Sequence, residues 1–183
     1  MNDKSAQTRW AIIKDYIQPG SVGVELGVFK GHFSPYLLTA KPRTLFLVDP
    51  WYRLGANWRW VKDQDSSTLN AFQEILTRFK TEINSGTAVP VVDFSVPFLN
   101  TLSPKSLDFI YLDSSHAYED TKNEIAAASR VLKDDGVLLG DDWRDDPQHR
   151  HYGVAKAVKE YIDAGKCTPL FNPKDCQWGV KFL

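Results

Sequence analysis

The chain has 183 residues, 43% of them hydrophobic and 25% charged, which is the composition of one globular domain and excludes a disordered segment. Its formal net charge of −1 argues against a broad electrostatic grip on nucleic acid or on an anionic membrane surface. No apolar run approaches the roughly 20 residues that cross a bilayer, and the first residues, MNDKSAQTRW, lack the pattern of a secretory signal.

Strand-like and helix-like patterns alternate along the chain. Helices are expected over residues 5–18, from after Gly31 through Leu38, and over 69–83, 119–133 and 154–162. Strands are expected over residues 22–26, 44–48, 88–92, 107–112, 137–139, 168–171 and 177–182. This alternation indicates βαβ units. It predicts a single-domain, Rossmann-like α/β fold with a seven-stranded, mainly parallel sheet and helices on both faces.

Two details refine the predicted sheet. The last two strands follow each other too closely for a parallel crossover, so we expect an antiparallel C-terminal pair. Pro90 lies within the third strand, where it removes a backbone donor, so we expect that strand at an edge of the sheet.

Residues 51–67 form a long aromatic and charged segment within the single domain expected over 1–183. The segment contains Trp51, Tyr52, Trp58 and Trp60. Aromatic faces stack on sugars or planar rings, so this segment is a candidate lid over a ligand. It could equally pack on the domain itself or contribute to a homodimer contact.

The two cysteines, Cys167 and Cys176, match no zinc-binding spacing. We interpret them as reduced thiols, with a disulfide between them as the less favoured alternative. Together with the missing secretory pattern, they lead us to expect a cytoplasmic protein.

A glycine-containing loop follows the first strand, in the sequence VGVELGVFKG. In sheets of this kind, ligands bind beyond the carboxyl ends of the strands. Gly27 and Gly31 allow a tight turn and a close approach of the backbone to a ligand, but their spacing is not that of a dinucleotide fingerprint. Glu25 would repel a pyrophosphate and suits a ligand with a positive charge. A simple turn is the alternative.

Acidic residues also end the second and third strands. Asp49 could accept both hydrogen bonds of a ribose diol, or it could cap a turn before Pro50. Asp93 could accept a hydrogen bond from an adenine amino group, with Phe94 beside the ring, or it could simply be a polar strand end.

The segments VGVELGVFKGHFS, LFLVDPW, DFIYLDSSHAYEDTKNEI and GVLLGDDW resemble the class I S-adenosylmethionine-dependent methyltransferases. Within that class, the chain is similar to the small O-methyltransferase-like family that includes macrolide and aminocoumarin sugar O-methyltransferases. The resemblance implies that Glu25, Gly27 and Gly31 line the methionine end of the cofactor and that Asp49 holds its ribose. It further implies that Asp93 and Ser95 lie near the adenine, and Asp113 is included among the cofactor-binding residues.

Three carboxylates end the fourth and fifth strands, which we expect to be neighbours. Asp113, Asp141 and Asp142 offer the hard oxygen ligands that suit Mg²⁺ or Mn²⁺, and the metal-dependent relatives resemble the sequence at these positions. Adjacent residues on a strand point to opposite faces, so Asp141 and Asp142 could both bind only where the chain leaves strand geometry. The alternative is that Asp142 begins an acidic, solvated loop.

His116 follows Asp113 by three residues and is a candidate general base, although a histidine in a loop is more often an ordinary hydrogen-bonding residue. His149 and His151 are a second source of a base, for which an exposed loop is the favoured interpretation. The predicted reaction is methyl transfer from S-adenosylmethionine to a hydroxyl of a small-molecule or sugar acceptor, with metal assistance. The alternatives are N-methylation, a cofactor-binding module without catalysis, and an NAD-dependent oxidoreductase.

Overall fold

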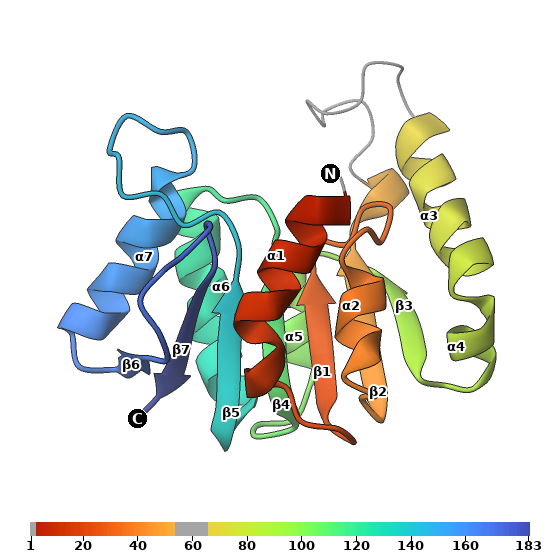
Figure 1. The fold of residues 1–183 in the computed structure, drawn as a ribbon, viewed down its shortest axis with the longest axis horizontal. Coiled ribbons are helices and arrows are strands. Elements are labelled where there is room, and N and C mark those ends of the chain that lie inside the picture. The colour runs from red at the N-terminus through yellow and green to blue at the C-terminus, as the bar shows by residue number, and fades with distance from the viewer. Residues whose placement is uncertain (1–2, 54–65) are drawn as a thin grey trace.

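Seven strands form one sheet in the order β3-β2-β1-β4-β5-β7-β6 in the computed structural model, which describes residues 3–53 and 66–183 (Figure 1). The strands are β1 (Val22–Leu26), β2 (Thr44–Asp49), β3 (Ala88–Val92), β4 (Leu107–Leu112), β5 (Leu132–Gly140), β6 (Cys167–Pro169) and β7 (Trp178–Phe182). The first five strands pair in parallel, and β7 runs antiparallel to both β5 and β6. The structure therefore confirms the predicted α/β sheet, its antiparallel C-terminal pair and the edge position of β3.

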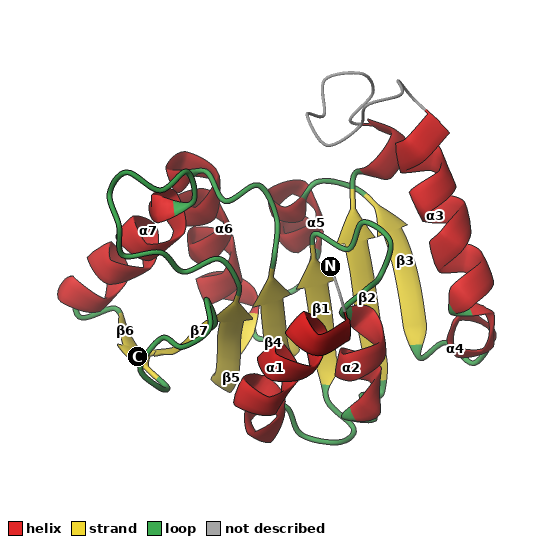
Figure 2. Cartoon of the chain, turned by 45° about the horizontal axis from the view of Figure 1, so that its top comes forward, coloured by secondary structure: helices red, strands yellow, loops and turns green. Residues whose placement is uncertain are grey.

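Helices cover both faces of this sheet (Figure 2). One face carries α1 (Asp3–Ile13), the 3₁₀ turn η1 (Lys14–Tyr16), α2 (Ser34–Thr39), α3 (Ser66–Arg78) and α4 (Lys80–Asn84). The other face carries α5 (Ser95–Thr101), α6 (Tyr118–Val131) and α7 (Tyr152–Asp163).

The central strand β4 explains why two separate cores form. Phe109 and Tyr111 pack with the side chains of α1, α2 and α3, whereas Ile110 and Leu112 pack with those of α5, α6 and α7. Successive side chains of a strand point to opposite faces, so a strand buried on both sides must be apolar throughout. Burial on both faces therefore explains the apolar runs of the sequence.

The structure corrects three of the predicted elements. The helix expected over 69–83 is interrupted at Phe79, where the backbone leaves helical geometry, and becomes α3 and α4. The end of the helix expected over 119–133 belongs instead to β5, because Leu132 is buried and pairs with Leu107 before the register shifts. Helix α5 was missed, since seven residues are too few to show a helical period.

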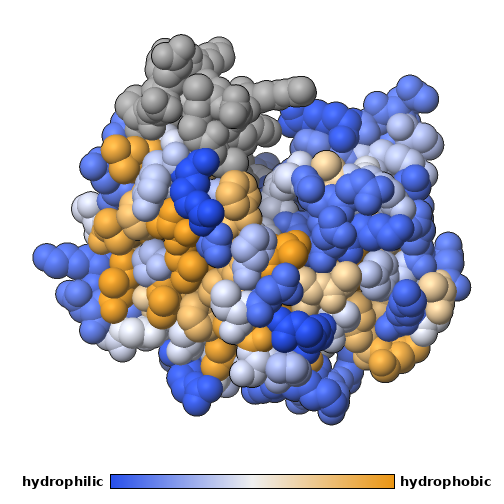
Figure 3. All heavy atoms as spheres, turned by 180° about the vertical axis from the view of Figure 1, so that it is seen from behind, coloured by the Kyte–Doolittle hydropathy of each residue, from blue (hydrophilic) through white to orange (hydrophobic). Residues whose placement is uncertain are grey.

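Figure 3 shows the face with α5, α6 and α7, on which hydrophobic side chains gather towards the β3 edge and hydrophilic ones cover most of the opposite half. The strand β3 is only partly buried after its first residue because it ends the sheet. None of the described helices combines the length and the apolar character that crossing a bilayer requires. The homodimer stays a prediction.

Both cysteines are free thiols, with Cys167 buried and Cys176 half-buried. The structure thus agrees with the interpretation of reduced cysteines.

Candidate functional site

The sheet order reverses direction between β1 and β4, so the loops that follow these two strands lie side by side. A cavity of about 870 Å³ opens beyond this point, which is the switch point where ligands bind in open α/β sheets. Its size falls within the range of small-molecule sites. Of the predicted cofactor residues, it is lined by Gly27, Asp49, Ser95 and Asp113.

The two glycines of the first loop have different surroundings. Gly27 has a φ of +90°, and a Cβ there would lie 2.1 Å from the carbonyl oxygen of Asp113. Gly31 has a φ of +64°, and a Cβ there would lie 2.7 Å from both Ile75 and Phe79. The missing Cβ of Gly27 therefore allows the loops after β1 and β4 to approach each other at the cavity. The missing Cβ of Gly31 allows α3 to approach the loop after β1.

Asp49 holds the first loop through backbone hydrogen bonds. Its Oδ2 accepts from the amides of Val28 and Phe29 at 3.0 and 2.9 Å, and its Oδ1 accepts from the amide of Trp51 at 2.7 Å. The side chain is buried yet contributes to the cavity wall. The turn-capping interpretation of Asp49 is therefore correct, and its ribose-binding role stays a prediction.

Trp51 belongs to the core and not to a lid. Its side chain is fully buried against Phe72, and its indole nitrogen donates to the carbonyl of Phe29 at 2.7 Å. Tyr52 is exposed and its ring lies edge-on to that of Phe72, whereas Trp58 and Trp60 lie outside the described residues.

Asp93 is not among the described residues that line the cavity. It forms an ion pair with Arg53, with 2.6 Å between Nη1 and Oδ1, and its Oδ1 accepts from the amide of Phe94 at 2.9 Å. Phe94 and Ser95, which follow it, do line the cavity. The placement of Asp93 and Ser95 near an adenine stays a prediction.

Glu25 is almost completely buried near the end of β1, and the hydroxyl of Ser34 donates to its Oε2 at 2.5 Å. Burial raises the pKa of Glu25 to about 8, and the negative charge of Asp113 adds to this shift. The side chain is therefore mostly protonated at neutral pH until a positive charge comes near it.

The raised pKa of Glu25 makes the stability of the fold depend on pH. Between the ordinary pKa of 4.5 and the folded pKa of about 8, the carboxyl is protonated in the folded chain and ionised in the unfolded chain, so stability falls as pH rises. Replacement of Glu25 by glutamine removes this titration. We expect the variant to gain stability relative to the wild type by up to about 1.4 kcal/mol per pH unit across this window.

Urea denaturation of both proteins at several pH values measures this difference. A difference that stays constant with pH would show that Glu25 is already ionised in the folded protein.

Glu124 is a buried acid of the cavity that the sequence interpretation missed. Both of its carboxylate oxygens accept from the hydroxyl of Ser114, at 2.7 and 2.8 Å, and Ser95 also bonds to it. Burial raises the pKa of Glu124 to about 7 despite these bonds. It lies on the buried stripe of α6 with Thr121 and Ala128, and an acid on that stripe is the signal that could have revealed it.

Asp113, Asp141 and Asp142 converge at the ends of β4 and β5, with one oxygen from each lying within 4.8 Å of the others. Asp142 has a φ of +60°, so the chain has left strand geometry there, as two adjacent converging carboxylates require. A second set of potential ligand atoms, with the same spacing limit, is formed by His116, Asp142 and His151.

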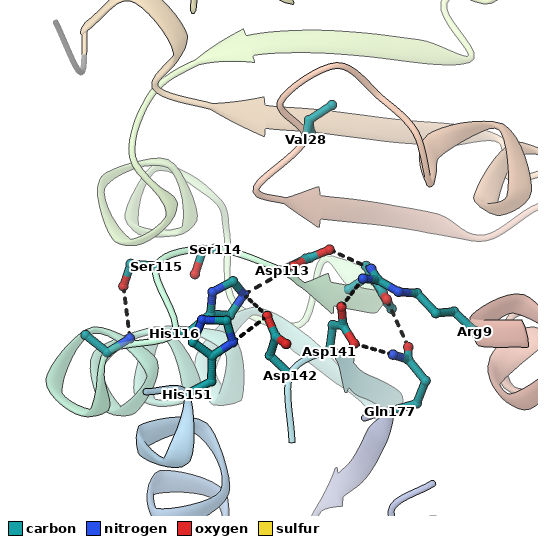
Figure 4. A network of polar contacts seen from close by, with 12 residues as sticks. Arg9, Val28, Asp113, Ser114, Ser115, His116, Asp141, Asp142, His151 and Gln177 are labelled. Carbon is teal, nitrogen blue, oxygen red and sulfur yellow. Dashed lines mark hydrogen bonds and ion pairs between the residues drawn. The ribbon is translucent and has the colours of Figure 1, made fainter. Parts of the chain in front are cut away.

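Arg9 of α1 lies between two of these carboxylates (Figure 4). Its Nη1 donates to Oδ2 of Asp113 at 2.8 Å, and its Nη2 contacts Oδ2 of Asp141. The amide of Gln177 donates to the other oxygen of Asp141 at 2.5 Å, and the hydroxyl of Tyr111 donates to Gln177 at 2.9 Å. Burial opposes the charge of Arg9, but Tyr111 and the two carboxylates outweigh it, so that its pKa is raised.

His116 and His151 both contact Asp142, the third carboxylate. Nε2 of His116 lies 3.2 Å from Oδ1 of Asp113 and 3.2 Å from Oδ2 of Asp142, and Nδ1 of His151 lies 3.0 Å from the same oxygen of Asp142. The two rings stack with 4.7 Å between their centroids. The exposed-loop interpretation is wrong for His151, whose side chain is only 13% exposed.

The carboxylates control the protonation of His116. Burial opposes a positive charge there, but the hydrogen bond to Asp113 and the charges of Asp113 and Asp142 outweigh it, so the pKa of His116 is raised. The pKa of His151 is lowered by burial and by the charge of His116, against the effect of Asp142. Of the two imidazoles, His116 is therefore the better proton acceptor.

Comparison with solved structures identifies the class of protein. The fold matches a TDP-rhamnose 3′-O-methyltransferase of calicheamicin biosynthesis, CalS11, with a TM-score of 0.67 and 14% identity over 97% of this chain and 78% of that chain. It matches a Burkholderia thailandensis 1,6-didemethyltoxoflavin-N1-methyltransferase with a TM-score of 0.65 and 14% identity over 99% and 79% of the two chains. It also matches the Podospora anserina methyltransferase PaMTH1, bound to S-adenosylhomocysteine, with a TM-score of 0.64 and 11% identity over 97% of this chain and 77% of that chain.

Identities this low establish the shared fold, which is that of the class I S-adenosylmethionine-dependent methyltransferases. A search of curated protein sequences finds no match. The profile of a family described as "Methyltransferase domain" matches residues 24–143, from β1 to the residue after Asp142, and the chain belongs to this family. Arg9, His151 and Gln177 lie outside the matched residues.

Proposed function

We propose that the protein transfers a methyl group from S-adenosylmethionine to a hydroxyl of a small-molecule or sugar acceptor, with His116 as the general base. The observation that carries this proposal is the contact of His116 with Asp113, whose carboxylate lines the cavity. The carboxylates beside Nε2 orient the ring and leave Nδ1 as the atom that takes the proton. The raised pKa of His116 suits that task.

The cavity fits the cofactor in three respects. Its volume of about 870 Å³ accommodates a nucleoside with an amino-acid chain. The wall at Gly27 has no Cβ, so a ligand can reach the backbone. Asp113 places an acidic group at the end of β4, where it would attract the positively charged methionine end, while Asp49 and Ser95 would lie along the nucleoside. Glu25 is buried near the end of β1 and would ionise when that positive charge comes near it.

The bound cofactor supplies an electrophilic methyl carbon on a sulfonium. The acceptor oxygen forms a bond to this carbon as the carbon–sulfur bond breaks, and the electron pair of that bond goes to sulfur. The acceptor proton goes to Nδ1 of His116. The protein contributes the position of the acceptor and the charges of Asp113 and Asp142, which stabilise the imidazolium.

A small-molecule acceptor is supported by the cavity volume of about 870 Å³ and by the formal net charge of −1, which offers no general attraction to nucleic acid. The Mg²⁺ or Mn²⁺ predicted from the sequence stays a prediction, and no step of the proposal depends on it. Each of its three carboxylate ligands already has a guanidinium or imidazole partner.

The proposal is tested with His116→Asn, which keeps a polar side chain but cannot act as a base. We expect turnover to fall by roughly 100-fold or more, the usual contribution of a general base, while the affinity for S-adenosylmethionine changes little. Transfer of labelled methyl groups to a panel of hydroxylated small molecules and nucleotide sugars measures turnover, and calorimetry measures affinity.

The matched control is His32→Asn, which alters an exposed histidine outside this site and should leave both quantities unchanged. Full turnover of His116→Asn on hydroxyl acceptors would remove the base from the mechanism. Turnover only on amine acceptors, independent of His116, would favour N-methylation.

A further inference from the structure

The guanidinium of Arg9 pairs with two of the three carboxylates in the cluster that the sequence assigns to a divalent ion. It bridges Asp113 and Asp141 through its two terminal nitrogens, as Figure 4 shows, and enters from the side opposite the two histidines. Its side chain is only 13% exposed, and that of Asp141 only 3%. This is a buried arrangement of complementary charges and not a surface ion pair.

We infer that Arg9 is the resident cation of this cluster and that it takes the place of a divalent metal ion. The inference deepens the proposed function, because it concerns the same site, but it does not depend on the identity of the acceptor. Arg9 is a positioning residue in this account, since it acts through the carboxylates and not on the reacting atoms.

The first argument concerns the ligand atoms. Both oxygens of Asp141 are used, one by Arg9 and the other by Gln177. Both oxygens of Asp113 also have partners, namely Arg9 and His116. A Mg²⁺ ion binds oxygen ligands at about 2.0 to 2.1 Å. It would therefore have to displace Arg9 or to lie beside its positive charge.

The second argument concerns the fixation of Arg9. Ala6 and Ile13 lie on the same face of α1, one turn before and one turn after it, and both are buried in the core. The guanidinium also lies 5.9 Å from the centroid of the Phe33 ring. The helix thus presents Arg9 to the cluster from a packed position, and its withdrawal would require α1 to move.

The third argument concerns His116. Arg9 holds Oδ2 of Asp113, while Oδ1 of the same carboxylate contacts Nε2 of His116 at 3.2 Å. Through this carboxylate, the arginine fixes the orientation of the imidazole. A divalent ion bound by Asp113 would also have placed positive charge beside this carboxylate, so the chain has an internal, singly charged substitute for it.

The inference is tested by Mn²⁺ binding, followed by electron paramagnetic resonance and calorimetry. We expect the wild type to show no saturable binding at the cluster, whereas Arg9→Gln removes the charge and frees the oxygens of Asp113 and Asp141 that Arg9 contacts. The variant should therefore bind Mn²⁺ at least roughly tenfold more tightly than the wild type. Arg9→Lys keeps the charge and should not gain this binding.

Further variants locate the binding. Adding Asp141→Asn to Arg9→Gln should abolish the gained affinity. Lys105→Gln, which removes an exposed ion pair with Asp134, should leave Mn²⁺ binding as in the wild type. If Arg9→Gln is less stable, Mn²⁺ should raise its melting temperature but not that of the wild type, since a ligand stabilises the state it binds.

The inference is overturned if the wild type binds Mn²⁺ saturably and Asp141→Asn removes that binding, or if Arg9→Gln gains none. Methyl transfer by the wild type should also be insensitive to a chelator. Loss of transfer with a chelator, together with wild-type binding, would overturn the inference and leave the proposed function intact. Failure to find any methyl transfer would affect the proposed function but not the binding result.

Discussion

Replacement of Asp49 by alanine is expected to lower the free energy of unfolding by about 4 kcal/mol and to abolish measurable binding of S-adenosylmethionine. The carboxylate accepts three backbone hydrogen bonds, from Val28, Phe29 and Trp51, and it is 5% exposed. Alanine leaves these donors without their acceptor in a place that water hardly reaches. The loop after β1 then loses the contact that holds it over the cavity.

Asp49→Asn separates the structural role from the ribose-binding role. Asparagine has a single carbonyl oxygen, so it cannot accept at both positions, and we expect a loss of stability of about half that of the alanine variant. Urea denaturation and calorimetry with S-adenosylmethionine measure the two effects. Weaker cofactor binding with unchanged stability would mean that Asp49 acts on the ribose alone. Asp163→Ala, an exposed acid at the end of α7, should change neither quantity.

Gly27→Ala is expected to have the second largest effect, a loss of about 3 kcal/mol of stability. A Cβ at this position would lie 2.1 Å from the carbonyl oxygen of Asp113, and the φ of +90° is unfavourable for any residue with a Cβ. The loops after β1 and β4 would have to separate. Because both loops line the cavity, we expect the affinity for S-adenosylmethionine to fall together with the stability.

Gly86→Ala is the matched control for this prediction. Gly86 has a φ of +76°, and a Cβ there would meet no atom within 4 Å, so its replacement introduces backbone strain without a clash. We expect a loss of about 1 kcal/mol and unchanged cofactor affinity. Equal losses of stability for the two variants in chemical denaturation would show that a clash with Asp113 does not contribute to the effect of Gly27→Ala.

The pattern of apolar residues was enough to place the strands. The apolar runs predicted the bounds of β1, β3 and β4 as observed, and β2 extends one residue further, to Asp49, whereas β5 begins at Leu132 and not at the predicted Val137. The pattern was not enough for short or interrupted helices. Helix α5 shows no clear period, and the interruption at Phe79 leaves the apolar spacing of α3 and α4 intact.

The convergence of the acids at the strand ends could also be predicted, because the carboxyl ends of parallel strands meet at one edge of a sheet whatever the details of packing. This rule brought Asp113, Asp141 and Asp142 together correctly. The rule could not reveal which atoms surround a glycine of the loop. Gly31 was expected to line the ligand site, yet it faces α3, since only the docking of that helix decides which atoms lie beside it.

The sequence by itself determined the parallel sheet and the acidic edge where a ligand would lie, because these follow from local periodicity and from the rule for strand ends. The cofactor was implied by the resemblance of the motifs to a known family. Only the tertiary structure decided which partners those acids have. Arg9 is 104 residues from Asp113 and Gln177 is 36 residues from Asp141, and neither lies in a recognisable motif with its partner. Their contacts depend on how α1 packs against the sheet and on how β7 pairs with β5, which no local pattern encodes. The charge that balances the carboxylates is therefore a property of the packed fold.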